Sequence, residues 1–553
     1  MTRRERLTLL ATILGSTIVF LDSTVVNVAL PAIKEDLDTG LAGQQWVVEA
    51  YMLTLVAFLL VGGSLGDLYG RRRLFEIGLA GFAATSALCA IAPTSEFLIG
   101  ARALQGIAGA MLVPGSLAIL AHTFEGEARG RAVGLWTAWA GVSTLIGPAG
   151  GGLLVEVDWR WIFWLNLPLI IGTILLSRHS VEESSNPDAV RGIDTVGIVL
   201  SAVGLGGPVF ALIEQPTYGW ADPLVAIPLI VGIVSLVGFV LWEARAHAPM
   251  MPLGLFRSRN FAMVNLATLC VYGGLYGASF FITLFLQQVA GYTAFQAGLA
   301  TTPITVIMLV LSGRFGALAG RIGPRLVMGF GPIVGAVGLL LMARLDQNGD
   351  YLGTVLPALI PFGVGLAMTV APLTTTVLDS VEEHRAGVAS GVNNAVSRVA
   401  GLLAIAALGA VVSAQFASVL DDRIDGRELS PTASAAVDDA KAEPLAGGVG
   451  GDIPGEEEQQ LDADVTGSSE SAFHLGMLIG AALMALGGGI ALAGVRNPER
   501  REEAAPEPPR GVPAGAAATA GECGRHFGDP DGSGVPGSLT PEPGASGVPD
   551  PVL

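Results

Sequence analysis

Lysine is almost absent from this chain of 553 residues, and charge of either sign is scarce. The two lysines, Lys34 and Lys441, do not follow a glycine-rich loop, so no Gly-Lys-Ser/Thr cradle for nucleotide phosphates exists. Charged residues make up 14% of the sequence, whereas soluble globular proteins carry about 25%. These absences exclude a P-loop motor and argue against a soluble domain.

Cysteine and histidine are too few and too scattered for the usual redox and metal sites. The three cysteines form neither a disulfide framework nor a metal-ligand spacing. The six histidines lie mostly at the ends of apolar stretches or in polar segments, which argues against haem. Neither Gly-x-Ser-x-Gly nor His-Glu-x-x-His occurs. We therefore predict a protein that is not an enzyme, with no catalytic residue, no cofactor and no metal.

Long apolar stretches are abundant instead. Hydrophobic residues reach 51% and the mean hydropathy is +0.59. About 20 apolar residues in a helix cross the hydrocarbon core of a bilayer, so stretches of this length predict an all-α integral membrane protein. We place fourteen spans, at 7–32, 45–66, 74–92, 97–121, 132–155, 160–177, 194–213, 223–242, 261–288, 296–313, 326–343, 352–378, 387–416 and 471–495.

The distribution of arginine and lysine tests this count, because cytoplasmic segments are enriched in basic residues. With the N-terminus inside and fourteen spans, 22 of the 30 basic residues fall in inner segments and 6 in outer ones. Arg102 and Arg398 lie within spans. Adding or removing one span would invert every later assignment. We predict a multi-pass protein of the cell membrane with both termini cytoplasmic.

Acidity is concentrated in two polar segments. Residues 417–470 hold fourteen Asp and Glu against three basic residues, and 497–553 hold nine against four, which accounts for most of the net charge of −18. Both segments are poor in aromatic residues, so we expect disorder in each. The outer segment 417–470 is either a solvated linker or a vestibule that concentrates cations.

Two inner loops repeat each other. Gly63–Arg72 (GSLGDLYGRR) follows the second span, and Gly316–Arg325 (GALAGRIGPR) follows the tenth, with Gly320 in the place of Asp67. Such repeats mark secondary transporters built from two similar halves. The position of the second copy implies two extra spans between the halves. We predict a six-helix half at 1–177, two linking spans at 178–260, a second six-helix half at 261–495 with the acidic outer loop, and a disordered cytoplasmic tail at 496–553.

Five motifs in order carry a family resemblance. They are Leu21–Pro31 (LDSTVVNVALP), the Asp67 loop, Arg102–Gly109 (RALQGIAG), Ser143–Gly152 (STLIGPAGGG, with Ser143 in the place of the usual glycine) and Trp159–Pro168 (WRWIFWLNLP). Over about 7–416 and 471–495 the chain resembles the major facilitator superfamily, and more narrowly its fourteen-span drug:proton antiporters. The resemblance implies the major facilitator fold and export driven by the proton gradient.

Three charged residues within spans are candidates for proton or cation coupling. A carboxylate in hydrocarbon costs several kcal/mol unless it is paired, protonated or facing water, which singles out Asp22. Arg102 is permanently charged and must face water or an anion; the resemblance implies that it lines the cavity and takes part in proton coupling. Glu49, near the outer end of the second span, is a weaker candidate. The alternatives are a hydrogen bond in helix packing for Asp22, a structural ion pair for Arg102 and an exposed acid for Glu49.

Two further motifs are candidates for gating. The resemblance implies that Asp67 latches the two halves in the outward-open state; the other residues of this motif are Gly70, Arg71 and Arg72. The fifth span contains Gly147, Pro148, Gly151 and Gly152. Proline kinks a helix and glycine permits close packing, and the resemblance implies a bend that seals the cavity. The alternatives are a role in topology for the arginines and a plain packing kink.

A few more residues lie in spans expected to face the pore. An aromatic cage for lipophilic cations or ordinary packing would explain Trp136, Trp139, Tyr272, Tyr276, Phe280 and Phe281. Arg398 is considered as a partner for Asp379.

The sequence thus predicts a proton-driven antiporter that exports small amphipathic or cationic compounds, sits in the lipid bilayer, binds no nucleic acid and works as a monomer. Two alternatives stay open. One is a dedicated exporter of a self-made antibiotic or metabolite, and the other is a membrane sensor or scaffold that does not transport.

Overall fold

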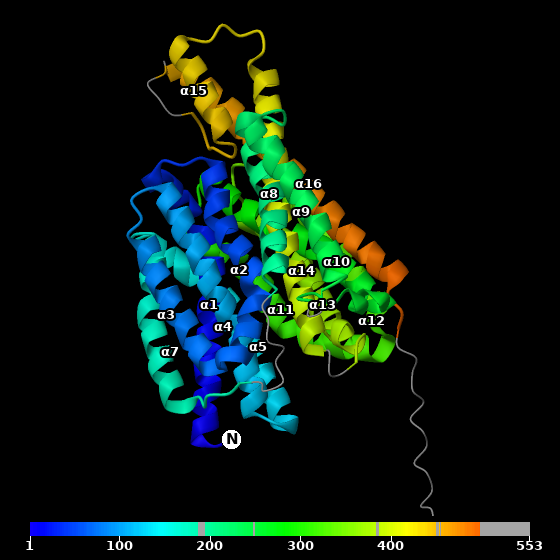
Figure 1. Ribbon diagram of the computed structural model, residues 1–553. Helices are drawn as coiled ribbons and strands as arrows, with labels where there is room; N and C mark the ends of the chain where they lie inside the picture. The colour runs from blue at the N-terminus through cyan, green and yellow to red at the C-terminus, as the bar shows by residue number, and fades with distance from the viewer. Residues whose placement is uncertain (186–193, 247–248, 383–385, 450–452, 454, 498–553) are drawn as a thin grey trace, which may run out of the picture. The chain divides into compact units, whose positions relative to one another are not determined.

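The computed structural model describes residues 1–185, 194–246, 249–382, 386–449, 453 and 455–497, and every regular element in these ranges is helical (Figure 1). The expected disorder of 498–553 lies outside the described residues. The first helices are α1 (Arg3–Leu37), α2 (Leu41–Tyr69), α3 (Arg71–Ala90), α4 (Ser95–Thr123), α5 (Gly126–Val155), α6 (Trp161–Trp164), α7 (Asn166–Ser180), α8 (Thr195–Tyr218) and α9 (Pro223–Glu243). The later ones are η1 (Leu253–Arg257), α10 (Arg259–Gln288), α11 (Ala294–Ile322), α12 (Pro324–Met342), η2 (Tyr351–Val355), α13 (Leu356–Asp379), α14 (Ala386–Ile424), α15 (Pro431–Ala442) and α16 (Gly455–Gly494).

Each of the fourteen predicted spans falls on a helix, the sixth being divided into α6 and α7. Within the described ranges, twelve helices are long and apolar enough to cross a membrane, and α2, which bends by 50°, makes thirteen. The remaining predicted span, α5, is represented there by the apolar stretch Ile146–Val155. The all-helical membrane fold is confirmed, whereas the count of fourteen stays a prediction.

The helices pack in two groups, α1–α7 and α10–α16, and α8 and α9 form a hairpin that packs on α2 and α14 (Figure 1). The first helix of each group is tied in the same way to the last. Arg4 Nε donates to the Ser180 carbonyl at the end of α7 (3.0 Å), and Arg259 Nε donates to the Gly494 carbonyl at the end of α16 (3.1 Å). The internal repeat seen in the loop motif therefore extends to tertiary contacts.

The two repeated loops are also built alike. Gly70 between α2 and α3 has φ 106°, and Gly323 between α11 and α12 has φ 91°, a region that favours glycine. A polar side chain caps the following helix in each case. Glu183 accepts from the Arg72 backbone N–H (3.1 Å), and Asn497 accepts from that of Arg325 (3.1 Å). The glycines of the motif are thus needed for the turn itself.

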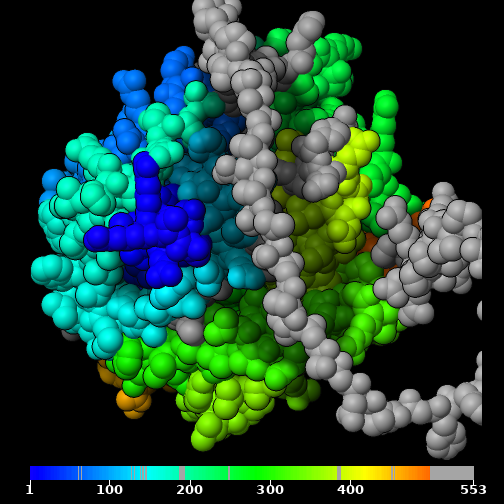
Figure 2. Space-filling view, turned by 90° about the horizontal axis from the view of Figure 1, so that it is seen from below, coloured from blue at the N-terminus to red at the C-terminus, as the bar shows by residue number. Residues whose placement is uncertain are grey.

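The helices have two ends, which we name the N-terminal face, where α1 begins, and the opposite face, where α1 ends. Figure 2 looks onto the N-terminal face, with the blue and cyan surface of the first group on one side and the green and yellow surface of the second on the other. Close contacts between the groups lie toward the opposite face. Gln45 of α2 donates to the Ile405 carbonyl of α14 (2.8 Å), and Lys34 pairs with Glu443 (2.6 Å).

The described part of the acidic segment 417–470, which is all of it except 450–452 and 454, is largely helical, so the expectation of disorder is wrong there. Helix α14 continues to Ile424, α15 follows it, and α16 begins at Gly455. These elements extend past the other helices at the opposite face (Figure 1). Apolar side chains such as Val437 and Val465 are buried among them, and Arg427 pairs with Asp464 (2.5 Å). Composition missed this because small apolar residues at helical spacing supply a core that the acidic average conceals.

Candidate functional site

Asp22 and Arg102 form an ion pair inside the first group of helices. Asp22 lies midway along α1 and Arg102 lies two turns into α4. The distance from Arg102 Nη1 to Asp22 Oδ2 is 2.5 Å, and each side chain is 1% exposed. A buried charge without a partner costs several kcal/mol, and here each charge is the partner of the other. The structure thus pairs two residues that the sequence analysis treated separately.

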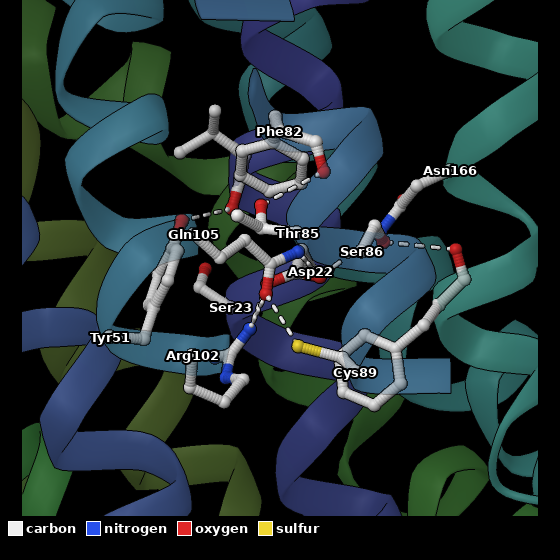
Figure 3. A network of polar contacts seen from close by, with 12 residues as sticks. Asp22, Ser23, Tyr51, Phe82, Thr85, Ser86, Cys89, Arg102, Gln105 and Asn166 are labelled. Atoms are coloured by element: carbon white, nitrogen blue, oxygen red, sulfur yellow. Dashed lines mark hydrogen bonds and ion pairs between the residues drawn. The ribbon is translucent and has the colours of Figure 1, made fainter. Parts of the chain in front are cut away.

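Two amides complete the pair (Figure 3). Asp22 Oδ1 accepts from Gln105 Nε2 and from Asn166 Nδ2, both at 3.1 Å. Gln105 Oε1 in turn accepts from Arg102 Nη1 (2.7 Å) and from the Cys89 thiol (3.6 Å). Both oxygens of the carboxylate are therefore occupied, and α1, α3, α4 and α7 all contribute to one network.

Aromatic rings enclose the guanidinium. It lies 4.2 Å from the centre of the Tyr51 ring and 5.9 Å from that of Phe163, which adds cation–π attraction in a buried site. Its Nε donates to the carbonyl of Val47 on α2 (3.0 Å). Arg102 is 1% exposed, so in this conformation it faces an anion and not the cavity that the resemblance implied.

The two charges of this network balance each other. With Asp22 ionised, Arg102 is neutralised and the network is closed. A proton on Asp22 would leave Arg102 without its counter-charge in an apolar site, which favours rearrangement of α1 against α4. Proton binding at this carboxylate would thus be linked to helix packing.

Sequence reasoning missed Gln105, Asn166 and Tyr51 as members of the site. Gln105 and Asn166 stand inside motifs that were recognised, so their polarity within a span was the available signal. Tyr51 carried none. Arg102 was recognised as a cation within a span, but the sequence did not identify Asp22 as its partner.

Glu49 of α2 does not join the network. It is fully buried, with 0% exposure, and neither carboxylate oxygen has a hydrogen-bond partner among the described residues. An ionised carboxylate in such a place is strongly disfavoured, so Glu49 fits a neutral acid. The alternative of an exposed acid is wrong for this conformation.

The glycines of α5 allow close contact with two other helices. A side-chain carbon added at Gly147 would lie 2.3 Å from Thr24 Oγ1, and one added at Gly151 would lie 2.6 Å from Val25 Cγ1, both on α1. One added at Gly152 would lie 2.6 Å from the Ala294 carbonyl oxygen on α11. Helix α5 therefore contacts its own group and the other group at the same level.

Pro148 lies in this contact as well. Its carbonyl oxygen is 2.1 Å from where a side-chain carbon of Gly298 on α11 would be. Because Gly298 lies close to the start of α11, the contact is at the opposite face. Glycine on both helices is needed for α5 and α11 to meet there.

The Asp67 loop is closed on itself. Asp67 Oδ1 accepts from Arg71 Nε (2.9 Å) and lies 2.8 Å from its Nη2. Arg72 donates to the Val181 carbonyl after α7 (3.2 Å). In this conformation the loop binds its own group, and the latch between the groups that the resemblance implies for the outward-open state stays a prediction.

The remaining candidates from the sequence are aromatic side chains and Arg398. Phe280 and Phe281 are 1% and 0% exposed, so they pack in the core. Tyr272 and Tyr276 form a pair with ring centres 5.9 Å apart. The proposed partnership of Arg398 with Asp379 is not found; Arg398 contacts the sulfur of Met52 instead.

The comparisons with known proteins agree with this architecture. The sequence profile described as Major Facilitator Superfamily matches residues 12–427. The chain belongs to the major facilitator superfamily. It is therefore a multi-pass membrane transporter and not an enzyme. Superfamily members are generally driven by ion gradients without a cofactor, and no group of three potential metal-binding side chains is found in the described ranges.

Relatives of this major facilitator chain include proteins named for drug resistance, antibiotic export and multidrug efflux. The multidrug resistance protein Stp of Mycobacterium tuberculosis is 37% identical over 81% of this chain and 84% of its own length. The tetracenomycin C resistance and export protein of Streptomyces glaucescens is 32% identical over 92% and 95%. The multidrug efflux pump LfrA of Mycolicibacterium smegmatis is 34% identical over 73% and 80%.

Solved structures share the fold. An inward-facing, unoccupied bacterial homologue of the human lysosomal transporter Spinster superposes with a TM-score of 0.59, at 15% identity, covering 90% of this chain and all of the other. The inward-open xylose transporter XylE of E. coli gives 0.55, at 12% identity, covering 89% and 97%. At these identities the likeness concerns the major facilitator fold alone.

Proposed function

We propose that this protein is a proton-driven antiporter that exports amphipathic drugs or other toxic compounds across the cell membrane. The observation that carries the proposal is the Asp22–Arg102 pair, a titratable carboxylate held by a permanent cation at 1% exposure within a membrane domain. The names of three relatives, two of which denote drug or antibiotic resistance and one a multidrug efflux pump, support the nature of the cargo.

The proton and the cargo are exchanged by alternating access. In the outward-facing state, a proton from outside binds Asp22, frees Arg102 from its counter-charge and favours repacking of α1 against α4, which turns the cavity inward. Loss of the proton to the cytoplasm restores the ion pair. Cargo then binds the deprotonated, inward-facing protein and is carried outward, so that each inward proton is exchanged for outward cargo.

The moving bodies are the two six-helix halves at 1–177 and 261–495, with residues 178–260 as the linking hairpin. Both termini are cytoplasmic, so the opposite face is the outer face. The contact of Gly152 with Ala294 and the contact of Gln45 with Ile405 then close the outer side, as in an inward-facing state. In the outward-facing state, Asp67 is the latch on the inner side.

The transporter acts as a monomer on small amphipathic or cationic molecules taken from the cytoplasm or the inner leaflet. The acidic segment 417–470 lies outside the cell on this scheme, and the tail 496–553 lies inside. A protein of this kind needs no cofactor beyond the proton gradient.

Purified protein in proteoliposomes tests the proposal. An imposed pH gradient should drive a fluorescent cargo against its concentration gradient, and addition of cargo should move protons in the reverse direction. Dissipating the gradient with a protonophore should abolish both movements. If cargo addition moves no proton and no cargo accumulates, the alternative of a non-transporting sensor or scaffold is favoured.

A dedicated exporter of one antibiotic is the second candidate, favoured by the similarity to the tetracenomycin C export protein over 92% of the chain. Growth of a drug-sensitive host across a panel of compounds separates the two functions. Protection against chemically unrelated compounds indicates a multidrug exporter, and protection against a single scaffold indicates a dedicated one.

A further inference from the structure

Arg398 is a permanent cation inside a membrane helix, and it has no acidic partner among the residues that the structure describes. It lies twelve residues into α14, about 18 Å along the helix at 1.5 Å per residue, well within the thickness of the membrane. Its sole hydrogen-bond or ion-pair partner among the described residues is the sulfur of Met52, 3.8 Å from Nη1. A thioether is a weak acceptor and carries no charge, so the guanidinium is not neutralised.

This guanidinium faces accessible space between the two groups of helices. The contact with Met52 joins α14 to α2 across the groups, and Arg398 is half-buried. None of its nitrogens is among the enclosed polar atoms that lack a partner in the described ranges. An arginine at this depth that is neither paired nor enclosed must be hydrated or must bind an anion.

A pair of tyrosines lies beside it. Gly401, one turn from Arg398 on the same face of α14, packs against Tyr276 of α10; a side-chain carbon there would lie 2.6 Å from the Tyr276 ring. Tyr276 and Tyr272 have ring centres 5.9 Å apart. Within the described part of the chain, neither hydroxyl makes a hydrogen bond, and neither is among the enclosed orphan atoms. The tyrosine pair therefore lies about one helical turn from Arg398 along α14.

The same place is in electrostatic reach of the proton site. The Arg102 guanidinium lies 4.2 Å from the centre of the Tyr51 ring, and Arg398 contacts Met52, the next residue of α2. Asp22 cannot neutralise Arg398, because both of its oxygens are bound within the network around Arg102. A negative group that settles at Arg398 would therefore be felt at the pair that exchanges the proton.

Resting on the transport function proposed above, we propose that Arg398, with Tyr272 and Tyr276, forms the docking site for an anionic amphiphile. The cargo carries a carboxylate, enolate, phenolate or sulfonate next to a planar apolar ring system. The planar fork of arginine binds such anions through two parallel hydrogen bonds, and the tyrosine faces receive the rings. Amphipathic compounds with an acidic group are thereby included in the cargo class, at a site distinct from the one that cationic compounds use.

Two xanthene dyes of similar shape and opposite charge test this docking site. Binding of anionic fluorescein and cationic rhodamine 123 to the purified full-length protein is measured by fluorescence anisotropy. We expect Arg398→Gln to weaken fluorescein binding by about tenfold or more, the loss of one charge-assisted contact, and to leave rhodamine binding unchanged. Arg398→Lys, which keeps the charge without the fork, should recover part of the affinity.

Arg344→Gln is the matched control, because Arg344 is exposed in the turn after α12. It should leave both affinities unchanged, and thermal unfolding of each variant reports whether it is folded. Equal weakening of both dyes by Arg398→Gln, or no change for either, overturns the docking site. So does a wild-type protein that binds no fluorescein.

The same proteoliposomes separate this inference from the transport function. Proton-driven movement of rhodamine without fluorescein binding refutes the anionic site and leaves the antiporter standing. Fluorescein binding that depends on Arg398, in a protein that moves neither dye against its gradient, supports the site and refutes the antiporter.

Discussion

The Asp22–Arg102 pair is best tested by a double-mutant cycle. Asp22→Asn keeps a carbonyl oxygen to accept from Gln105 and Asn166, but it leaves Arg102 charged and 1% exposed with no anion. Removing one partner of a buried ion pair costs about 3–5 kcal/mol of the free energy of unfolding. Arg102→Gln should cost a similar amount, because it strands the carboxylate instead.

The double variant should be more stable than either single one. With both charges removed, two amides replace the pair and no uncompensated charge remains, so we expect a loss within about 2 kcal/mol of wild type. The effects of the two substitutions would then fall short of additivity by about 3 kcal/mol or more, a large coupling for residues in direct contact. Equilibrium unfolding in lipid–detergent micelles measures the three differences.

In the same three variants, the loss of transport should not follow the loss of stability. We expect all three to lose proton-driven accumulation of cargo, including the stable double variant, because none retains a carboxylate at position 22. Ser23→Ala on the same helix is the control and should retain both properties. Additive stability losses would refute the energetic pairing, and proton-driven accumulation by the double variant would refute the proton-carrying role of Asp22.

Three further outcomes follow from other contacts. Gly152→Leu should abolish efflux, because its side chain would meet the backbone of α11 and hold the two groups of helices apart at the opposite face. Gly150→Leu is the control and should not abolish efflux, because the nearest neighbour of Gly150 is a side chain of its own helix at 3.6 Å. Equal initial rates of efflux in the two variants would contradict this reasoning. Lys34→Glu places two negative charges at the Lys34–Glu443 contact and should slow efflux. The double variant Lys34→Glu/Glu443→Lys restores opposite charges and should restore the rate. A double variant as slow as the single one would show that the ion pair is not the cause. Glu49→Gln should keep the free energy of unfolding within about 1 kcal/mol of wild type, because a protonated glutamic acid and a glutamine are both neutral. A larger loss in chemical unfolding would show that the carboxylate of Glu49 is ionised.

Local rules and bilayer dimensions predicted much of the fold. Each predicted span falls on a helix because about 20 apolar residues have few other stable arrangements in a membrane. The loop that contains Gly70 was also recognised from the sequence, because its motif repeats in the loop that contains Gly323. Segment 417–470 was misjudged because its order depends on contacts such as that between Arg427 and Asp464, which composition does not reveal.

The amino-acid sequence by itself determined that charge inside the membrane is confined to a few positions. The free-energy cost of a charge in hydrocarbon depends on its depth in the bilayer and hardly at all on the details of the fold. Asp22 and Arg102 were recognisable for that reason. Only the tertiary structure decided that they neutralise each other, while Arg398 has no anion among the described residues. Pairing is a matter of distance between helices far apart in the sequence, and that distance is set by how glycines and large side chains pack, which no local pattern records.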